Sequence, residues 1–382
     1  MIAYLDNAAS TPPLPEVVEA MAKTMCDHYA NPSSLHGLGA AAARVLATAR
    51  EQVAALLRAE PEEMVFTGSG TEANALGFMG AAQSSRFRHV VVCAIEHAAV
   101  FDSARRLAEV GWQWSQVSPA SDGRVSADAV MAALRPETSV VAVMRVNNEI
   151  GTLQPVPEIA RALRTLGRKI HFHVDAVQAA GLAKVDARTL GADSIAISAH
   201  KLHGPKGIGA LWLRKGRRLA PLYGGGGQER ELRSGTEDLA AAVGFGVAAT
   251  TATTDREAAE RTRVLRDRFE DQVYAAIARA RPAVPRDTER APHIASILLP
   301  DLPAEPLLHA LEARGVYASE GAACSTRSHE QSRVMRALAV PTSTGALRFS
   351  LSRLTRPEEI EHAAHALAEA VTEIERAVHA TR

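Results

Sequence analysis

The sequence predicts an α/β protein whose larger part is built on a mostly parallel sheet, and three observations carry this prediction. From about residue 60 to residue 215, short β-rich runs alternate with helical patterns, as expected where helices connect parallel strands. After the four glycines at 224–227 this alternation gives way to patterns typical of long amphipathic helices. The length of 382 residues allows two or three domains with sizeable cores.

Six short apolar or alternating runs are predicted as strands. They span residues 64–67, 90–95, 139–146, 171–175, 194–198 and 208–213. Further along, apolar residues recur at every fourth position from Leu265 to Ile277, which predicts a long amphipathic helix. Thr355 and Glu358 fit a capping box with Pro357 in the first turn, so a last helix is expected to run from there to the end of the chain.

The change of pattern after residue 227 predicts two domains. We place a large domain at residues 16–255 and a smaller C-terminal α/β domain at residues 256–382. Residues 1–15 are expected to complete the smaller domain.

Composition and charge exclude several classes of protein. Hydrophobic residues make up 47% and charged residues 23%, and basic and acidic side chains balance at 43 each, so no overall charge favours nucleic acid or a membrane. The first residues lack the basic and apolar regions of a secretory signal, and no apolar run is long enough to span a bilayer. The three cysteines form no CxxC pair, so we expect a cytoplasmic protein without a disulfide framework.

Polar residues follow nearly every predicted strand. The clusters are Gly68-Ser69-Gly70-Thr71, Glu96-His97, Asn147-Asn148-Glu149, Asp175 with Gln178, and Ser198-Ala199-His200-Lys201. In open parallel sheets ligands bind outside the carboxyl ends of the strands. The five clusters therefore predict one site at one edge of the sheet.

The glycine-rich segment 68–71 lies between a predicted strand and a helical run at residues 72–82. Glycines let backbone N–H groups approach an anion, and a helix N-terminus adds its positive dipole end. An ordinary strand-to-helix turn is equally compatible with this segment. A third interpretation is a dinucleotide fingerprint, Gly68-x-Gly70-x-x-Ala73, with Glu96 as the ribose ligand. That interpretation leaves Asp175 and Lys201 unexplained.

Asp175 and Lys201 form the pair that pyridoxal phosphate (PLP) chemistry needs. A lysine forms a Schiff base with the aldehyde, and a carboxylate keeps the pyridine nitrogen protonated so that the ring withdraws electrons. Most lysines are merely surface residues. Lys201, however, precedes a glycine-rich loop at residues 203–209, which brings backbone close to a ligand.

Histidines near this pair have other possible roles. His171, His173 and Asp175 alternate along one strand and therefore share a face, as metal ligands would, but alternating strands often place histidines together without a metal. We predict no metal site. His97, at a strand end, is either a structural histidine or a residue that stacks on a ring or transfers a proton.

On these residues the chain resembles the cysteine desulfurases of the NifS and IscS kind, class V of the fold-type I PLP enzymes. The similarity runs from YLDNAA at residues 4–9 to RFSL at residues 348–351. Its most specific segments are VNNEIG (146–151), HVDAVQ (173–178), SAHK (198–201), GPKG (204–207) and RSGT (233–236). The resemblance implies the fold-type I architecture and PLP as cofactor.

The resemblance also implies how the cofactor ring is held. Lys201 would carry the cofactor, and Asp175 would pair with the pyridine nitrogen. His97 would stack on the ring and take part in catalysis, and Gln178 would hydrogen-bond the ring hydroxyl. Asn148 would contact both the cofactor and the substrate.

Phosphate and substrate binding follow from the same resemblance. The phosphate would be held by Gly70, Thr71, Ser198 and His200, with Thr236 reaching in from the second subunit of a homodimer. Asn148 and Arg348 would clamp the carboxylate of L-cysteine, because the planar guanidinium binds a carboxylate with two hydrogen bonds.

Cys324 occupies the position of the family's nucleophile. A lone cysteine is usually a small core residue, but this one lies in a polar stretch without apolar periodicity. Two departures from the family pattern stand out. Glu320, close to the thiol, would disfavour the thiolate, although Arg327 and His329 would offset it. Glu231 stands where relatives often have glycine.

The resemblance implies a cysteine desulfurase that converts L-cysteine to L-alanine and leaves the sulfur on Cys324 as a persulfide. A sulfur-acceptor protein, either a scaffold or a sulfur carrier, would then receive the sulfur for iron–sulfur cluster assembly or another sulfur-transfer pathway. Alternatives are a selenocysteine lyase or another class V lyase or aminotransferase. A nicotinamide-dependent oxidoreductase and a non-catalytic sulfur-trafficking scaffold are more distant.

Overall fold

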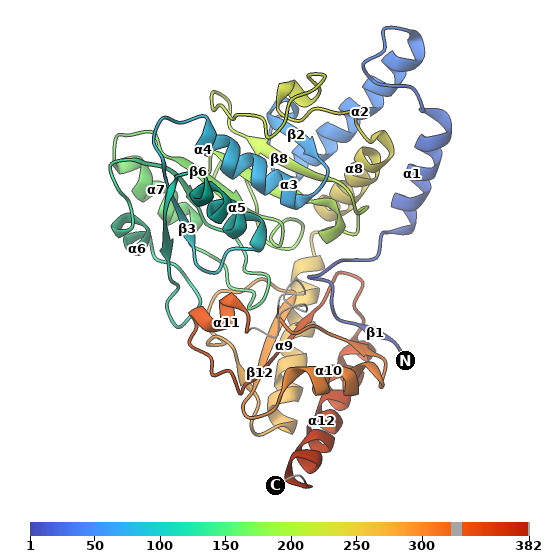
Figure 1. Ribbon diagram of the computed structural model, residues 1–382. Coiled ribbons are helices and arrows are strands. Elements are labelled where there is room, and N and C mark those ends of the chain that lie inside the picture. Colours follow the sequence, from blue (N-terminus) through green and yellow to red (C-terminus); the bar gives the residue numbers. More distant parts are fainter. Residues whose placement is uncertain (322–330, 381–382) are drawn as a thin grey trace.

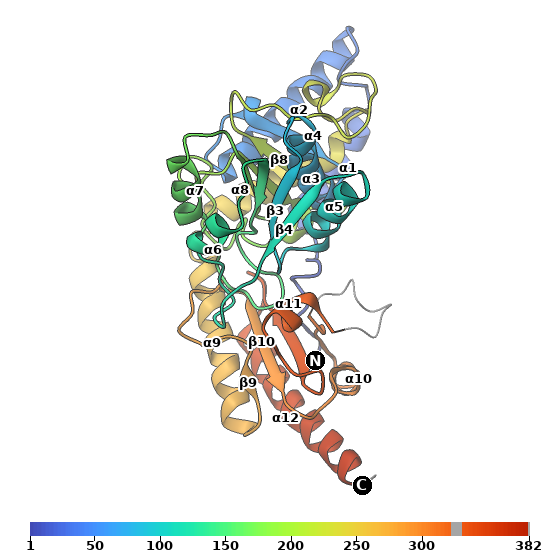
Figure 2. The same ribbon diagram turned by 60° about the vertical axis from the view of Figure 1, so that its left-hand side comes forward.

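The computed structural model describes residues 1–321 and 331–380 and consists of two lobes, one above the other in Figure 1. The upper, large lobe contains a seven-stranded sheet, and the lower, small lobe contains a three-stranded sheet. In Figures 1 and 2 the C-terminal end of the last helix points away from the large lobe. In the described ranges, no helix combines the length and the apolar character that crossing a bilayer requires.

The large sheet has the strand order β2-β8-β7-β6-β5-β3-β4. Its strands are β2 (Met64–Thr67), β3 (His89–Cys93), β4 (Gln113–Val117), β5 (Thr138–Ala142), β6 (His171–Asp175), β7 (Ser194–Ser198) and β8 (Gly209–Leu213). β8 runs antiparallel to both of its neighbours, and the other pairs are parallel. This arrangement confirms the predicted α/β class with a mostly parallel sheet. The sequence analysis missed β4, because this edge strand is only partly buried and carries glutamine and serine instead of an apolar run.

Helices cover both faces of this sheet, which explains why its central strands are buried along their whole length. Alternate residues point to opposite faces, so Val91 packs into one core and Val90 into the other. On the first face lie α1 (Pro15–Asp27), α2 (Gly37–Leu56), α6 (Ala127–Ala132), α7 (Val156–Thr165) and α8 (Leu239–Thr254). On the second lie α3 (Gly70–Ala75), a π-helical turn η2 (Leu76–Gly80), α4 (Ala81–Gln83) and α5 (Ala98–Glu109).

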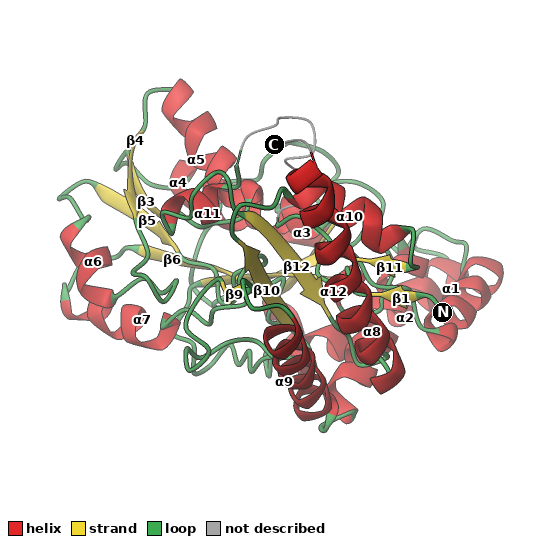
Figure 3. Cartoon of the chain, turned by 90° about the horizontal axis from the view of Figure 1, so that it is seen from below, coloured by secondary structure: helices red, strands yellow, loops and turns green. Residues whose placement is uncertain are grey.

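The small lobe has its own apolar core. Its sheet places β10 (Ile294–Leu299) between β12 (Gly345–Ser350) and β9 (Arg281–Pro282), all antiparallel. The remaining elements are α9 (Ala258–Ala276), α10 (Ala304–Glu312), α12 (Pro357–Ala380), and the pair β1 (Ala3–Tyr4) and β11 (Val316–Tyr317). Figure 3, a view from below, shows α9 and α12 nearest the viewer, over this sheet. Ala3 and Leu5 belong to this core although they begin the chain. The short helix α11 (Arg333–Ala337) instead packs Val334 and Met335 against the core of the large lobe.

Two details refine the sequence-based picture of the small lobe. The predicted amphipathic helix is α9, and Phe269 and Val273 are completely buried on its inner face. The cap of α12 lies one residue later than predicted, because the backbone N–H of Arg356 donates to the carboxylate of Glu359 at 2.8 Å, not to Glu358. The division into residues 16–255 and the rest remains a proposal.

Candidate active site

A cavity of about 280 Å³ lies at the carboxyl ends of β6 and β7, where the two lobes meet. Among the side chains and backbone that line it are Gly70, Thr71, His97, Asn148, Asp175, Gln178, Ser198, His200, Lys201 and Arg348. The sequence analysis named all of these. Ser69, from the predicted glycine-rich cluster, lines the cavity as well, whereas Ala8, Ala9, Asn74, Met144 and Val177 had not been predicted as site residues. The strand-end clusters therefore do meet at one edge of the sheet.

Asp175 ends β6 with a buried carboxylate. Its two oxygens accept hydrogen bonds from the side-chain amide of Asn74 at 2.8 Å and from the backbone N–H of Val177 at 2.9 Å. Burial raises the pKa of Asp175, while His97 and the two hydrogen bonds act in the opposite direction. A cationic partner in the cavity would favour the carboxylate form. Asn74 was missed because its partner is distant in the sequence.

Behind Asp175 a hydrogen-bonded chain runs along β6. The Asn74 oxygen pairs with Nε2 of His173 at 2.9 Å, and the hydroxyl of Ser194 lies 2.9 Å from Nδ1 of His173 and 2.8 Å from Nε2 of His171. Burial lowers the pKa of both histidines to about 3, so they are neutral at pH 7. Both histidines thus support the site through hydrogen bonds. Within residues 1–321 and 331–380, no group of three candidate ligands is placed to hold a metal.

The glycine-rich turn after β2 packs closely against β7 and β8. Ser69 caps α3, because its hydroxyl accepts the N–H of Glu72 at 3.1 Å. A Cβ on Gly70 would come within 2.9 Å of the Cβ of Ser198, and a Cβ on Gly209 would come within 2.5 Å of the backbone of Ser69. Ser198 is 1% exposed, and among the described residues its hydroxyl has no hydrogen-bond partner. The turn is therefore a polar cradle with no room for larger residues.

Lys201 lies in the short turn η3 (Ala199–Lys201) that follows β7. Its amine donates to the backbone carbonyls of Ala8 and, at 2.8 Å, of Ala9. The N-terminal segment therefore crosses to the large lobe and closes the cavity beside the lysine. The neighbouring His200 has its Nδ1 3.3 Å from the hydroxyl of Ser10, and burial lowers the pKa of His200 to about 4.

His97 is the N-cap of α5 and borders the same cavity. Its Nδ1 accepts the backbone N–H of Ala99 at 3.1 Å, and burial lowers its pKa, so the ring is neutral with the proton on Nε2. Glu96 does not line the cavity: it is 2% exposed and accepts the N–H of Met144 at 2.6 Å. Burial and Asp175 raise the pKa of Glu96. Glu96 is thus not available as a ribose ligand, which removes the main support for the dinucleotide interpretation.

Arg348 forms the small-lobe wall of the cavity and is only 2% exposed. Its guanidinium donates to the backbone carbonyl of Asn148 at 2.9 Å and to the carboxylate of Asp6 at 2.8 Å. The sequence analysis did not foresee the contact with Asp6, since the two residues lie at opposite ends of the chain. Arg348 is positioned to bind a carboxylate, with Asp6 as its present partner.

The two remaining predicted site residues are Thr236 and Cys324. Thr236 is exposed and is not among the residues that line the cavity. Cys324 lies outside the described residues. Just before Thr236, the turn η4 (Glu229–Glu231) has three successive non-glycine residues with φ between 46° and 63°. Glu229 holds this turn, because its buried carboxylate accepts hydrogen bonds from Arg50 at 2.5 and 2.7 Å and from the N–H of Phe66 at 2.7 Å.

Comparison with known proteins matches the aminotransferase class-V family to residues 3–362. The chain belongs to the class-V aminotransferase family. It is 40% identical to a cysteine desulfurase of Nostoc sp. over 97% of this chain and 93% of that protein. It is 37% identical to the cysteine desulfurase IscS of Methanosarcina thermophila over 97% and 92%. A solved structure named NIFS-like protein superposes with a TM-score of 0.91 at 32% identity and covers 97% of this chain and 100% of that one. The family resemblance seen in the sequence is confirmed.

The class-V family implies pyridoxal phosphate, and the residues of the cavity fit that group. The buried hydroxyl of Ser198 beside Gly70, which has no hydrogen-bond partner in the described part of the chain, suits a phosphate oxygen. Lys201 offers a primary amine for an aldehyde, and Asp175 offers a buried carboxylate for a protonated ring nitrogen. The cradle, the amine and the carboxylate all border one cavity, as a single phosphorylated ring requires.

Proposed function

We propose that the protein is a PLP-dependent cysteine desulfurase, which converts L-cysteine to L-alanine and transfers the sulfur to Cys324 as a persulfide. One observation carries the proposal: Lys201, Asp175 and Arg348 border the same cavity. Its relatives at up to 40% identity, which are named cysteine desulfurases, support the same activity.

When bound, pyridoxal phosphate supplies an aldehyde and a ring that withdraws electrons from the attached substrate. Lys201 would be the attachment point, and its amine would move protons during the reaction. Asp175 would face the ring nitrogen as a carboxylate, helped by the hydrogen bonds from Asn74 and the Val177 N–H. His97 would stack on the ring, and Gln178 would donate to the ring oxygen.

The phosphate and the substrate bind at different walls. Gly70, Thr71, Ser198 and His200 would hold the phosphate, and Thr236 of a second subunit would complete the set. Arg348 and Asn148 would hold the cysteine carboxylate. Because Arg348 already donates to Asp6, the substrate replaces an existing partner. The Cys324 thiolate then attacks the substrate sulfur: the carbon–sulfur bond breaks, a sulfur–sulfur bond forms, and alanine leaves after protonation of its carbon.

The two departures from the family pattern fit different parts of this scheme. Glu231 has φ 63°, a conformation that glycine adopts without strain, which agrees with the glycine common in relatives. The pKa of Glu320 is raised, first because its carboxyl group is partly desolvated and second because of the negative charge of Glu305. A carboxyl group that is protonated more readily disfavours the thiolate less.

Exposed apolar residues support the proposed homodimer. Met25, Tyr29, Leu35 and Leu38 are all largely exposed, and they lie between the end of α1 and the start of α2. Several exposed apolar side chains in one short segment are typical of an interface. Sedimentation of the purified protein should give a dimer. A fully active monomer would rule out both the dimer and the phosphate contact from Thr236.

The acceptor of the sulfur and the compartment also belong to the proposal. A scaffold or sulfur-carrier protein receives the persulfide sulfur for iron–sulfur cluster assembly or another sulfur-transfer pathway, and the names of the IscS relatives support the first use. We propose the cytoplasm as the compartment. The free thiols of Cys26 and Cys93 agree with a reducing environment.

The decisive experiment quantifies alanine and sulfide from L-cysteine for the wild type and for Cys324→Ala. The variant should keep its cofactor and its spectral response to cysteine, but lose the persulfide and nearly all sulfide release. Cys26→Ala is the matched control, because this thiol lies on α1, and it should behave like the wild type. Stoichiometric alanine and sulfide from Cys324→Ala at the wild-type rate would replace the persulfide mechanism with a simple lyase, including a selenocysteine lyase.

A further inference from the structure

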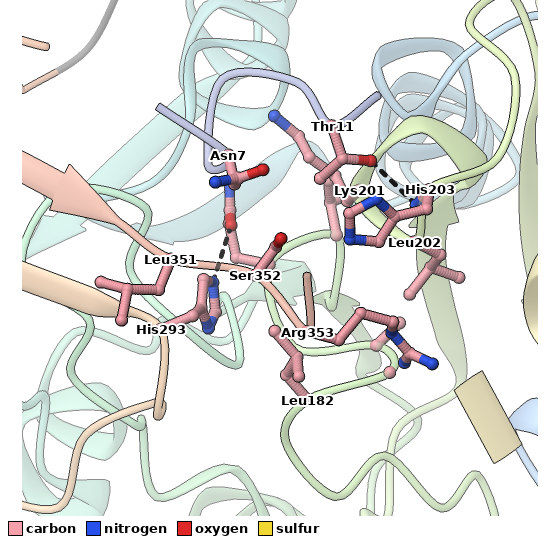
Figure 4. A pocket seen from close by; sticks show the side chains of 14 residues that line it. Asn7, Thr11, Leu182, Lys201, Leu202, His203, His293, Leu351, Ser352 and Arg353 are labelled. Carbon is pink, nitrogen blue, oxygen red and sulfur yellow. Dashed lines mark hydrogen bonds between the residues drawn. The ribbon is translucent and has the colours of Figure 1, made fainter. Parts of the chain in front are cut away.

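A buried histidine, His293, lies where the lobes meet, immediately before β10 (Figure 4). It is 5% exposed and lines a small cavity of about 20 Å³ together with Asn7, Ser352 and Gln178. Its Nε2 lies 3.3 Å from the side-chain oxygen of Gln178, and among the described residues its Nδ1 has no hydrogen-bond partner. His293 thus contacts a residue of the proposed cofactor site without lining the large cavity.

The contacts of Gln178 distinguish its amide nitrogen from its amide oxygen. The amide nitrogen lies 2.7 Å from the backbone carbonyl oxygen of Ala8, and a carbonyl only accepts hydrogen bonds. Turning the amide over would place two acceptor oxygens in contact. The Gln178 oxygen therefore faces His293, and Nε2 of His293 must carry the proton that it donates.

The surroundings of His293 keep it neutral in this tautomer. Burial lowers its pKa to about 3, and the positive charges of Arg266 on α9, Arg348 on β12 and Lys201 on η3 act in the same direction. Nδ1 is therefore unprotonated at pH 7 and cannot serve as a competing donor. His293 therefore has a single N–H, on Nε2, and this N–H faces the side-chain oxygen of Gln178.

We propose that His293 is a positioning residue that fixes the amide of Gln178, so that its N–H points into the cofactor cavity. One amide hydrogen is used by Ala8, and the second remains for the ring oxygen of pyridoxal phosphate. Without His293, the two orientations of the amide become closer in energy, and the flipped one turns an oxygen toward the ring oxygen. The inference rests on the proposed function, which assigns Gln178 to that oxygen.

The N–H of Gln178 stabilises negative charge on the ring oxygen, and so does a proton on the Lys201 nitrogen. The Gln178 N–H and the proton on the Lys201 nitrogen therefore compete for the ring oxygen. Without the Gln178 donor, the Lys201 nitrogen should hold its proton up to a higher pH, so the pH at which the bound cofactor's absorbance changes should rise. A hydrogen bond to a charged group corresponds to a shift of about one pH unit. The readout is the absorbance titration of the purified holoenzyme without cysteine, which needs no turnover.

Two variants of His293 separate positioning from packing. In His293→Gln the side-chain nitrogen takes the place of Nε2 and keeps a donor toward Gln178, whereas in His293→Asn the nitrogen takes the place of Nδ1 and that donor is lost. We expect His293→Asn to raise the titration midpoint by about one pH unit, as Gln178→Leu should, and His293→Gln to stay near the wild type. The double variant His293→Asn, Gln178→Leu should shift no further than Gln178→Leu. His89→Asn, at a buried histidine at the start of β3, is the control and should not shift.

The outcomes distinguish positioning by His293 from packing, and both from a failure of the proposed function. If His293→Asn titrates like the wild type while Gln178→Leu shifts, His293 does not position Gln178. If His293→Gln shifts as much as Gln178→Leu, the effect comes from packing and the inference is wrong. If the wild type forms no absorbing complex with pyridoxal phosphate, the proposed function itself fails.

Discussion

The two walls of the cavity are built differently. Asp175 in the large-lobe wall is held from within that lobe, by Asn74 and the Val177 N–H, with His173 behind. Arg348 in the small-lobe wall reaches out of its strand, to the Asn148 carbonyl across the lobe junction and to Asp6 at the other end of the chain. Asp175 is thus held by its own lobe alone, whereas Arg348 depends on contacts with two distant segments.

This difference separates cofactor binding from substrate binding. Groups that one sheet fixes in advance suit a resident cofactor, because little reorganisation is needed. A guanidinium that already has a carboxylate partner suits a ligand that comes and goes, since one charge-assisted contact replaces another. Changes in the large-lobe wall should therefore affect the cofactor, and changes in the small-lobe wall should affect the substrate.

The largest effect is expected from Lys201→Ala. Removing the amine deletes both the attachment point and the group that moves protons, so turnover should fall by at least about 10²–10⁴-fold. The yellow band of the bound cofactor should disappear while the fold remains. Lys206→Ala, at an exposed lysine in the same loop, is the control. Borohydride reduction of the wild type should fix the pyridoxyl group on Lys201, and finding it on Lys206 would refute the assignment.

Arg348→Ala should leave the cofactor spectrum unchanged and weaken cysteine binding. Losing hydrogen bonds to a charged group costs about 1.5–3 kcal/mol, or roughly 10- to 150-fold in kcat/KM, mostly through KM. Arg348→Lys keeps the charge without the planar fork and should be intermediate. An unchanged KM for Arg348→Ala would remove this residue from the substrate site and end the comparison between the two walls.

Acid should destabilise the fold through its buried histidines. His171, His173 and His293 have pKa values lowered by burial to about 3, below the 6.5 of an unfolded histidine. Their stabilisation is therefore complete above pH 6.5 and is lost as the pH falls toward 3. Each contributes a slope of about 1.4 kcal/mol per pH unit in that window. Urea unfolding at pH 7 and pH 5 measures the slope.

A single-histidine variant sharpens this test. His171→Gln should make the acid slope shallower, whereas His309→Gln, at an exposed histidine on α10, should leave it unchanged. Equal slopes for all three proteins would mean that His171 does not contribute to acid sensitivity.

The smallest effect is expected from Asp6→Asn. Removing the charge that competes for Arg348 should lower the KM for cysteine by about 2- to 5-fold, equivalent to ~0.5–1 kcal/mol, without altering the cofactor spectrum. Steady-state kinetics measures it. An increase in KM would show that Asp6 orients Arg348 for the substrate instead of competing with it.

The sequence predicted the fold class and the large-lobe wall well, because both follow from local patterns. A run of β-branched residues predicts a strand, and parallel strands bring their carboxyl ends, with Asp175 and Lys201, to one edge. The polar edge strand β4 lacked such a pattern. The supporting contacts of Asn74, Asp6 and His293 join segments far apart in the chain, and no local pattern encodes them. Thr236 depends on a second copy of the chain, so its role remains a prediction.

The close approach of β8 to the glycine-rich turn has a consequence for sequence variation. At Gly209 the three atoms nearest to a Cβ would be backbone atoms of Ser69 and Gly70, at 2.5–2.7 Å, and backbone cannot rotate away as a side chain can. At Gly207, where a Cβ would meet nothing within 4 Å, only the positive φ of 83° restricts the choice of residue, and asparagine tolerates that conformation. Among functional variants of a randomised library, position 209 should remain glycine, while position 207 should also accept other residues, such as asparagine. Two glycines that look interchangeable in the sequence thus have different evolutionary freedom.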